Sequence, residues 1–218
     1  MRMTERLRAL KEWTITNLCE GREMKAPAEN FDMGVINTQV PKCFLAWAPA
    51  RVDDMGNPIA VPESTVPSVL LLPNQAYAKY VEEGRFDRRL NVHRPQEFGQ
   101  QLAISFLFSV YEPGIRLPGF IDTVGERGNG LDTSLLLEGT EEGLMTLMSW
   151  MDDCMEKLLG AKIIPNSDLF VREDTITYSL YTDQKYVVDR RPIYYGFVNC
   201  VFGGYATEAD NAELRALL

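Results

Sequence analysis

The chain has 218 residues, of which 45% are hydrophobic and 24% are charged. This composition excludes a wholly disordered protein, and the length fits a single domain with its own hydrophobic core. The formal net charge is −9, which argues against specific binding to DNA or RNA, because a protein that grips phosphate backbones needs a basic surface.

The four cysteines lie far apart in the sequence, at Cys19, Cys43, Cys154 and Cys200. None of them forms the C-x-x-C spacing of a zinc ribbon or a thioredoxin-like site. The first residues do not form a signal peptide, and no apolar run approaches the roughly 20 residues that span a bilayer. These features predict buried, reduced thiols, folding in the cytosol and no membrane contact.

The first predicted element is a helix over residues 3–20, where apolar side chains recur every three or four positions. Thr4 is the expected N-cap, and Gly21 is expected to end the helix in the left-handed conformation. Short strands are then predicted at 42–48 and 68–72, the second ended by Pro73. Between them, residues 53–58 predict a turn.

Residues 74–100 are polar and weakly periodic, which is typical of a loop or an arm, and residues 112–134 form a second glycine-rich loop. A strand is predicted at 102–111 and a long helix at 140–159, capped by Thr140 and closed by Gly160. The remaining predicted elements are two strands within 168–181, a strand at 193–202 and a C-terminal helix at 207–218.

The strand at 193–202 is apolar on both sides. Such a strand is either covered on both faces, or covered on one face and used at an interface on the other. The predicted fold is therefore α+β: a mostly antiparallel sheet, an N-terminal helix, a second long helix packed on one face, and long loops or arms. We expect one domain over residues 1–218, with an insertion or extended arm region at about 22–100.

Catalytic signatures are missing from the sequence. His93 is the only histidine, and no nucleophile elbow, zinc-protease or phosphate-loop pattern occurs. The acidic pairs are adjacent residues, which do not face each other on a helix and cannot flank a substrate. These observations predict a protein that is not an enzyme and needs no metal or cofactor. A small hydrolase with a site built from distant carboxylates is the alternative.

Three segments carry a resemblance to a known family. They are residues 104–110 (ISFLFSV) before a loop, residues 138–142 (EGTEE) opening a helix that ends at residues 158–160 (LLG), and residues 191–198 (RPIYYGFV). With the element order, they resemble the tail-terminator proteins of long-tailed phages and phage tail-like particles. The resemblance covers residues 1–20 and 102–205. The chain is longer than many members of that family.

The resemblance implies a structural protein of the virion tail, assembled in the host cytoplasm. Such proteins form a ring, usually a hexamer, that caps the head-proximal end of the tail tube, ends tube polymerisation and joins the tail to the neck or collar. The implied partners are further copies of the chain, the tube protein, a neck or head-completion protein and the sheath protein. DNA passes through the lumen without being recognised.

A different neck, tail-completion or tube protein is the nearest alternative function. For contacts between subunits, the sequence favours the loops at 74–100 and 112–134 and the C-terminal helix. Arginines there would pair with acidic neighbours, and two phenylalanines would anchor the contact. The expected contact residues are Arg85, Phe86, Arg88, Arg89, Phe120 and Arg127.

Overall fold

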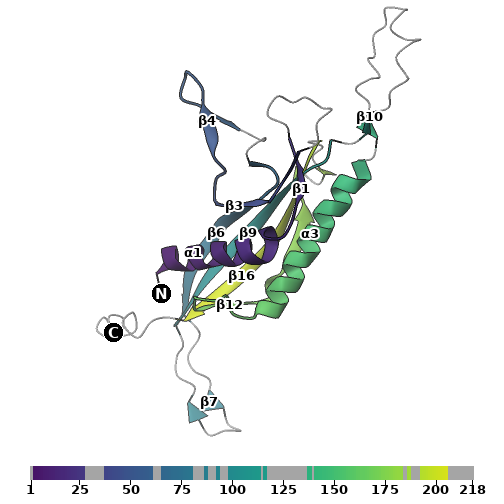
Figure 1. Ribbon diagram of the computed structural model, residues 1–218. Helices are drawn as coiled ribbons and strands as arrows, with labels where there is room; N and C mark the ends of the chain where they lie inside the picture. Colours follow the sequence, from purple (N-terminus) through teal and green to yellow (C-terminus); the bar gives the residue numbers. More distant parts are fainter. Residues whose placement is uncertain are drawn as a thin grey trace, which may run out of the picture.

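The computed structural model describes residues 2–27, 37–60, 65–80, 86–87, 92–93, 98–113, 115–116, 137–138, 140–183, 186–187 and 192–205. These residues form two layers, with two α-helices lying on the same side of one large sheet (Figure 1). The predicted α+β class, with a mostly antiparallel sheet and a long second helix on one face, is confirmed.

The main sheet has six strands, in the order β12–β16–β9–β6–β3, with β13 also paired to β16. All pairs are antiparallel except β3 with β6. The strands are β3 (Lys42–Leu45), β6 (Ser68–Tyr80), β9 (Phe98–Tyr111), β12 (Leu169–Val171), β13 (Thr177–Leu180) and β16 (Ile193–Tyr205).

Small two-stranded pairs surround this sheet. They are β1 (Met24–Ala26) with β2 (Asn37–Gln39), β4 (Ala50–Val52) with β5 (Pro58–Ala60), β7 (Phe86–Asp87) with β8 (Val92–His93), β10 (Ile115–Arg116) with β11 (Leu137–Glu138), and β14 (Thr182–Asp183) with β15 (Tyr186–Val187).

The N-terminal helix α1 (Met3–Thr14) continues without a break into a π-helical turn, η1 (Ile15–Cys19). Gly21 follows with a φ of +75°, as predicted for the end of this helix. The predicted N-cap, Thr4, is wrong: the cap is Arg2, whose backbone N–H donates to the carboxylate of Glu5 at 2.8 Å. Glu5 thus satisfies a helix-end donor that Thr4, already inside the helix, cannot reach.

The second helix, α3 (Thr140–Ala161), is two residues longer than predicted. Gly160 does not end it. The left-handed position falls instead on Lys162, with a φ of 52°. Position alone therefore does not make a glycine a helix stop, because a helix interior tolerates glycine at a cost of about 1 kcal/mol when packing favours continuation.

The core lies between the helices and one face of the sheet. From β16, Val198, Cys200 and Phe202 point into it and are buried. The ring of Trp150 on α3 meets that of Phe108 on β9 edge to face, with centroids 5.0 Å apart, and its indole N–H donates to the carbonyl of Leu18 at 2.9 Å. This bond ties α3 to the π-helical turn.

Strands β6 and β9 form a hairpin that is longer than predicted. Strand β6 does not stop at Pro73: its register with β9 shifts between Pro73 and Gln75, and pairing then continues to Tyr80 opposite Phe98. A proline lacks the N–H that a ladder needs, and a shift in register accommodates it. The sequence predicted a loop or an arm over 74–100; a loop is wrong at 74–80, 86–87, 92–93 and 98–100, where the backbone is strand.

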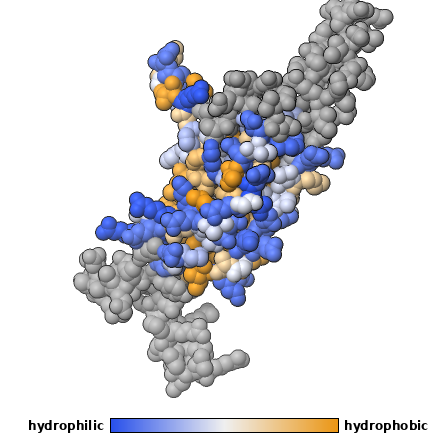
Figure 2. All heavy atoms as spheres, viewed as in Figure 1, coloured by the Kyte–Doolittle hydropathy of each residue, from blue (hydrophilic) through white to orange (hydrophobic). Residues whose placement is uncertain are grey.

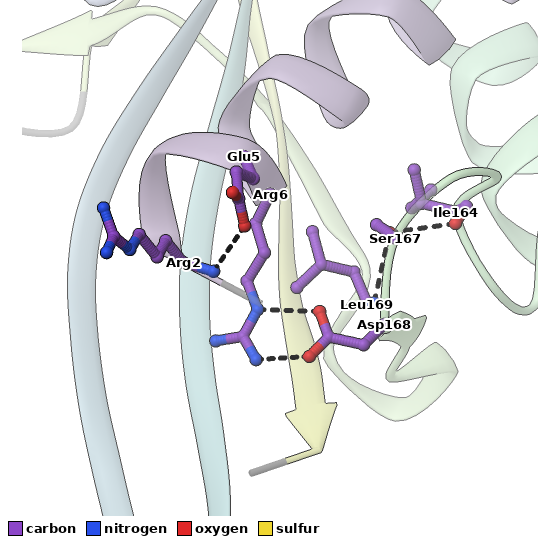
Figure 3. Close-up of polar contacts among 7 residues, drawn as sticks. All are labelled: Arg2, Glu5, Arg6, Ile164, Ser167, Asp168 and Leu169. Carbon is purple, nitrogen blue, oxygen red and sulfur yellow. Dashed lines mark hydrogen bonds and ion pairs between the residues drawn. The ribbon is translucent and has the colours of Figure 1, made fainter. Parts of the chain in front are cut away.

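One ion pair fastens α1 to the far end of the sheet. Arg6 is 1% exposed, and its guanidinium donates to both carboxylate oxygens of Asp168, at 2.8 and 2.5 Å (Figure 3). Gly204 on β16 leaves room for the guanidinium, since a Cβ there would lie 2.9 Å from its central carbon. Burial alone raises the pKa of Asp168, but the hydrogen bonds and charge of Arg6 outweigh it and hold that pKa below its ordinary value.

Replacing Asp168 with asparagine is expected to lower the free energy of unfolding by about 3 kcal/mol at pH 7, because a buried guanidinium then lacks its counter-charge. In the wild type, the ion pair contributes this stability fully above the pKa of Asp168 in the unfolded chain, which is about 4. The contribution is lost as the pH falls through the lower pKa of Asp168 in the folded protein. Urea unfolding of both proteins from pH 7 to pH 2 measures it.

The double variant Arg6→Met/Asp168→Asn is the matched control. It removes both charges, and its loss of stability should be smaller than the sum of the two single losses. Simple additivity, or an Asp168→Asn variant as stable as the wild type at pH 7, would contradict the role given to this pair.

Candidate protein–protein interface

One face of the main sheet carries the helices, and the other, named here the open face, does not. No helix in the described ranges packs against the open face. Its side chains alternate along the strands with those of the core. On β9, β13 and β16 the described side chains of this face include no Asp, Glu, Lys or Arg. In a chain with 24% charged residues, this is a distinct surface.

An apolar row crosses the open face. The strand registers place Phe44 of β3 beside Leu70 of β6, Leu70 beside Leu107 of β9, and Leu107 beside Phe197 of β16. All four side chains are half-buried. A continuous apolar row that is only half-buried is typical of a surface that packs against another protein.

Three aromatic rings gather at the end of this row. Tyr181, just after β13, stacks on Phe197 with ring centroids 5.8 Å apart, and lies 6.2 Å from the ring of Tyr195. We call Tyr181, Tyr195 and Phe197 the aromatic group. Aromatic side chains bury large areas at low entropic cost and dominate the binding energy of interfaces.

Five polar side chains of the open face bond to one another. The hydroxyls of Ser68 and Ser109 are 2.9 Å apart. Asn74 donates to the hydroxyl of Ser105, which in turn donates to the side-chain oxygen of Asn199. Because these groups have partners within the sheet, a protein covering the face need not supply partners for them.

The β4–β5 arm (residues 47–60) is the second exposed apolar surface. It leaves the sheet directly after β3 and stands clear of the body, with hydrophobic side chains on its surface (Figures 1 and 2). Met55 is 89% exposed, Trp47 84% and Val52 67%. Exposed apolar side chains on one projecting arm indicate a docking surface.

A network of hydrogen bonds fixes the tip of this arm, at the predicted turn. One carboxylate oxygen of Asp53 accepts the backbone N–H groups of Met55 and Asn57 at 2.9 and 2.7 Å, and Gly56 takes a φ of +85°. The bond from the backbone of Asn57 is the main reason that the pKa of Asp53 lies below its ordinary value. These bonds hold the tip in one conformation.

The predicted contact residues fall almost entirely outside the described residues. Phe86 lies in β7, where its backbone pairs with His93, and its side chain is not described. The predicted C-terminal helix at 207–218 also lies outside them, as do Arg85, Arg88, Arg89, Phe120 and Arg127.

Some members of the adjacent acidic pairs form ion pairs with basic side chains. Asp153 pairs with Arg22 at 2.5 Å, and Asp152 is exposed on α3. The amine of Lys25 forms an ion pair with the buried carboxylate of Glu112 at 2.6 Å, and it lies 3.8 Å from the carboxylate of Glu142.

Within the described ranges, no three His, Cys, Asp or Glu side chains come together as metal ligands, and no helix is both long and apolar enough to cross a bilayer.

All four cysteines are buried and free of disulfides, which confirms their predicted place in the core. Burial raises the pKa of Cys19, Cys43 and Cys200 to about 12 and that of Cys154 well above its ordinary value. A buried thiol with so high a pKa is protonated at neutral pH and is a poor nucleophile.

No known protein family and no curated protein matches this chain. The open face and the arm are therefore interpreted from their own geometry.

The two faces of β9 should respond differently to the loss of one leucine side chain. Leu102→Ala, on the covered face, is expected to lower the free energy of unfolding by about 3 kcal/mol, because it opens a cavity in the core. Leu107→Ala, on the open face, should cost about 1 kcal/mol or less. Equal losses in urea unfolding would show that the open face is packed as tightly as the core.

The folded protein should be unreactive toward a thiol reagent such as dithionitrobenzoate at pH 8, since all four thiols are buried and protonated. Unfolding in guanidinium should release four reactive thiols. A thiol that reacts rapidly in the folded protein would contradict the burial described above.

Proposed function

We propose that this chain is a tail terminator: a structural protein that assembles as a ring on the head-proximal end of a phage tail tube. The open face is the observation that supports this proposal most. On β9 and β16 the described side chains of this face are half-buried or buried, and on β9, β13 and β16 they carry no charge, which suits a surface that is covered by a neighbour. The element order also agrees with that expected from the resemblance.

A ring needs two different surfaces on each copy, one meeting the other around the circle. The sheet offers two edges on opposite sides. Among the described residues, β3 pairs only with β6, and β13 pairs only with β16. An edge strand presents backbone groups that can pair with the strand of a neighbour. The two edges thus supply the unlike surfaces of a head-to-tail contact.

The proposed ring ends tube polymerisation by covering the last layer of tube subunits. Its other side meets the neck, the head-completion protein or a collar, and its rim meets the sheath where one exists. A net charge of −9 on each copy suits a lumen through which DNA slides, because like charges do not adhere. No catalytic step belongs to this function.

Deletion of the gene from a producing strain is expected to yield overlong, headless tubes of variable length, because nothing then stops the addition of tube subunits. Electron microscopy of the particles gives the length distribution. Expression of the wild-type gene from a plasmid should restore the normal length and the infectious titre.

Other outcomes point elsewhere. Tubes of normal length without heads would assign the chain to the neck, and an absence of tubes would assign it to tube initiation. Normal infectious particles would reject an assembly role and favour an enzyme with a site built from distant carboxylates.

A further inference from the structure

We infer that the β4–β5 arm of one copy packs on the aromatic group of the next copy, so that arm and open face together form the contact that builds the ring. This inference rests on the proposed function and names the surfaces that act in it. It assigns a role to the arm, whose apolar side chains have no place in the core.

The positions of the two surfaces on the sheet suit such a contact. The arm follows β3, at one edge, and the aromatic group lies on β16 and next to β13, at the opposite edge. Two unlike surfaces at opposite edges make a head-to-tail contact, which closes into a ring when the rotation between copies allows it. An arm and a face at the same edge would instead favour a closed pair.

The reach of the arm is sufficient. Strand β4 (Ala50–Val52) spans roughly 10 Å, and the turn that carries Met55 extends the arm beyond it. Neighbouring strands are about 4.8 Å apart, so the first two strands of a neighbour, β13 and β16, lie within roughly 10 Å of its edge. The tip can therefore pass over the edge and reach the rings of Tyr181, Tyr195 and Phe197.

The charge of the chain restricts where a second copy can dock. Copies that each carry −9 repel one another, and they can meet closely only where charges are few. The open face of β9, β13 and β16 meets that condition. Met55 and Trp47 supply the apolar side, and methionine sulfur makes favourable contacts with aromatic rings.

A lipid membrane is a poorer occupant for the arm. Asp53 and Asp54 lie beside Met55 at the tip, and Asp53 is held ionised by the backbone N–H groups that it accepts. Insertion of the tip into hydrocarbon would carry these carboxylates with it, which is costly. At a protein surface they can stay at the hydrated rim.

The test uses two single variants of the full chain and their mixture. Met55→Lys places a charge on the arm, and Ser179→Glu places one on the exposed β13 position beside Phe197. Each variant alone should assemble at least about tenfold more weakly than the wild type in sedimentation velocity, since every contact in its ring is damaged. Met145→Lys, on an exposed methionine of α3, is the matched control and should assemble normally.

Mixing the two variants in equal amounts should restore assembly. In a head-to-tail ring, a Met55→Lys arm then meets a Ser179→Glu face, and the remaining contacts are wild type. Restored rings with an even number of copies are the expected result. Failure of the mixture to assemble, or normal assembly of Met55→Lys alone, would overturn the inference.

A second measurement does not depend on the strength of assembly. The double variant Met55→Cys/Ser179→Cys should form disulfide-linked multimers on mild oxidation, because the proposed contact brings the two new thiols of neighbouring copies together. The four native thiols are buried and do not interfere. Met145→Cys/Ser179→Cys should stay monomeric on a non-reducing gel. An absence of multimers in the first variant would reject the arm contact, as would binding of the wild type to phosphatidylcholine vesicles that Met55→Lys abolishes.

The two proposals can fail separately. If deletion of the gene gives overlong tubes but the Met55 and Ser179 variants assemble normally, the chain remains a terminator with a different subunit contact. If the Met55→Lys variant fails to form rings but deletion of the gene leaves tube length unchanged, the arm contact is retained and the terminator function is rejected.

Discussion

The core of this protein is built on one side of two long strands, β9 and β16. Their alternate side chains, with Phe106, Phe108 and Phe202 the largest, pack against the helices. Close approach of α3 requires a glycine at 196, where a Cβ would lie 2.5 Å from the sulfur of Met151. The positions of both helices, and the ion pair of Arg6 with Asp168, follow from this one-sided burial.

Because only one face of β9 and β16 packs in the core, their other face is available for a different contact. Every second residue of β9 and β16 faces away from the core, and three of the polar ones, Ser105, Ser109 and Asn199, bond to other side chains of the same face. A solvent-facing sheet usually alternates apolar residues with charged ones. The absence of charges among the described side chains of β9, β13 and β16 distinguishes this part of the open face from an ordinary outer surface.

Periodicity predicted both helices and the long strands, because their stripes are set by burial. Their ends were less predictable. Thr4, Gly160 and Pro73 each carry a local signal that packing or a change of register overrides. The sequence predicted an arm region at about 22–100 and a turn at 53–58, but not the exposed apolar side chains of the arm. Met55 and Trp47 have the hydropathy of core residues, and only the fold shows that they are exposed. From the sequence alone, the second face of β16 could be either covered or used at an interface.

The arm lies inside the crossover that joins the parallel strands β3 and β6. Both ends of this connection are held by strand pairing, so its middle can change without shifting the register of any strand. The entropy of closing a loop grows only slowly with its length, by about 0.6 kcal/mol for each doubling. The arm is thus an exchangeable module: a change in its length or its tip would alter the surface that it presents while the two-layer body stays unchanged.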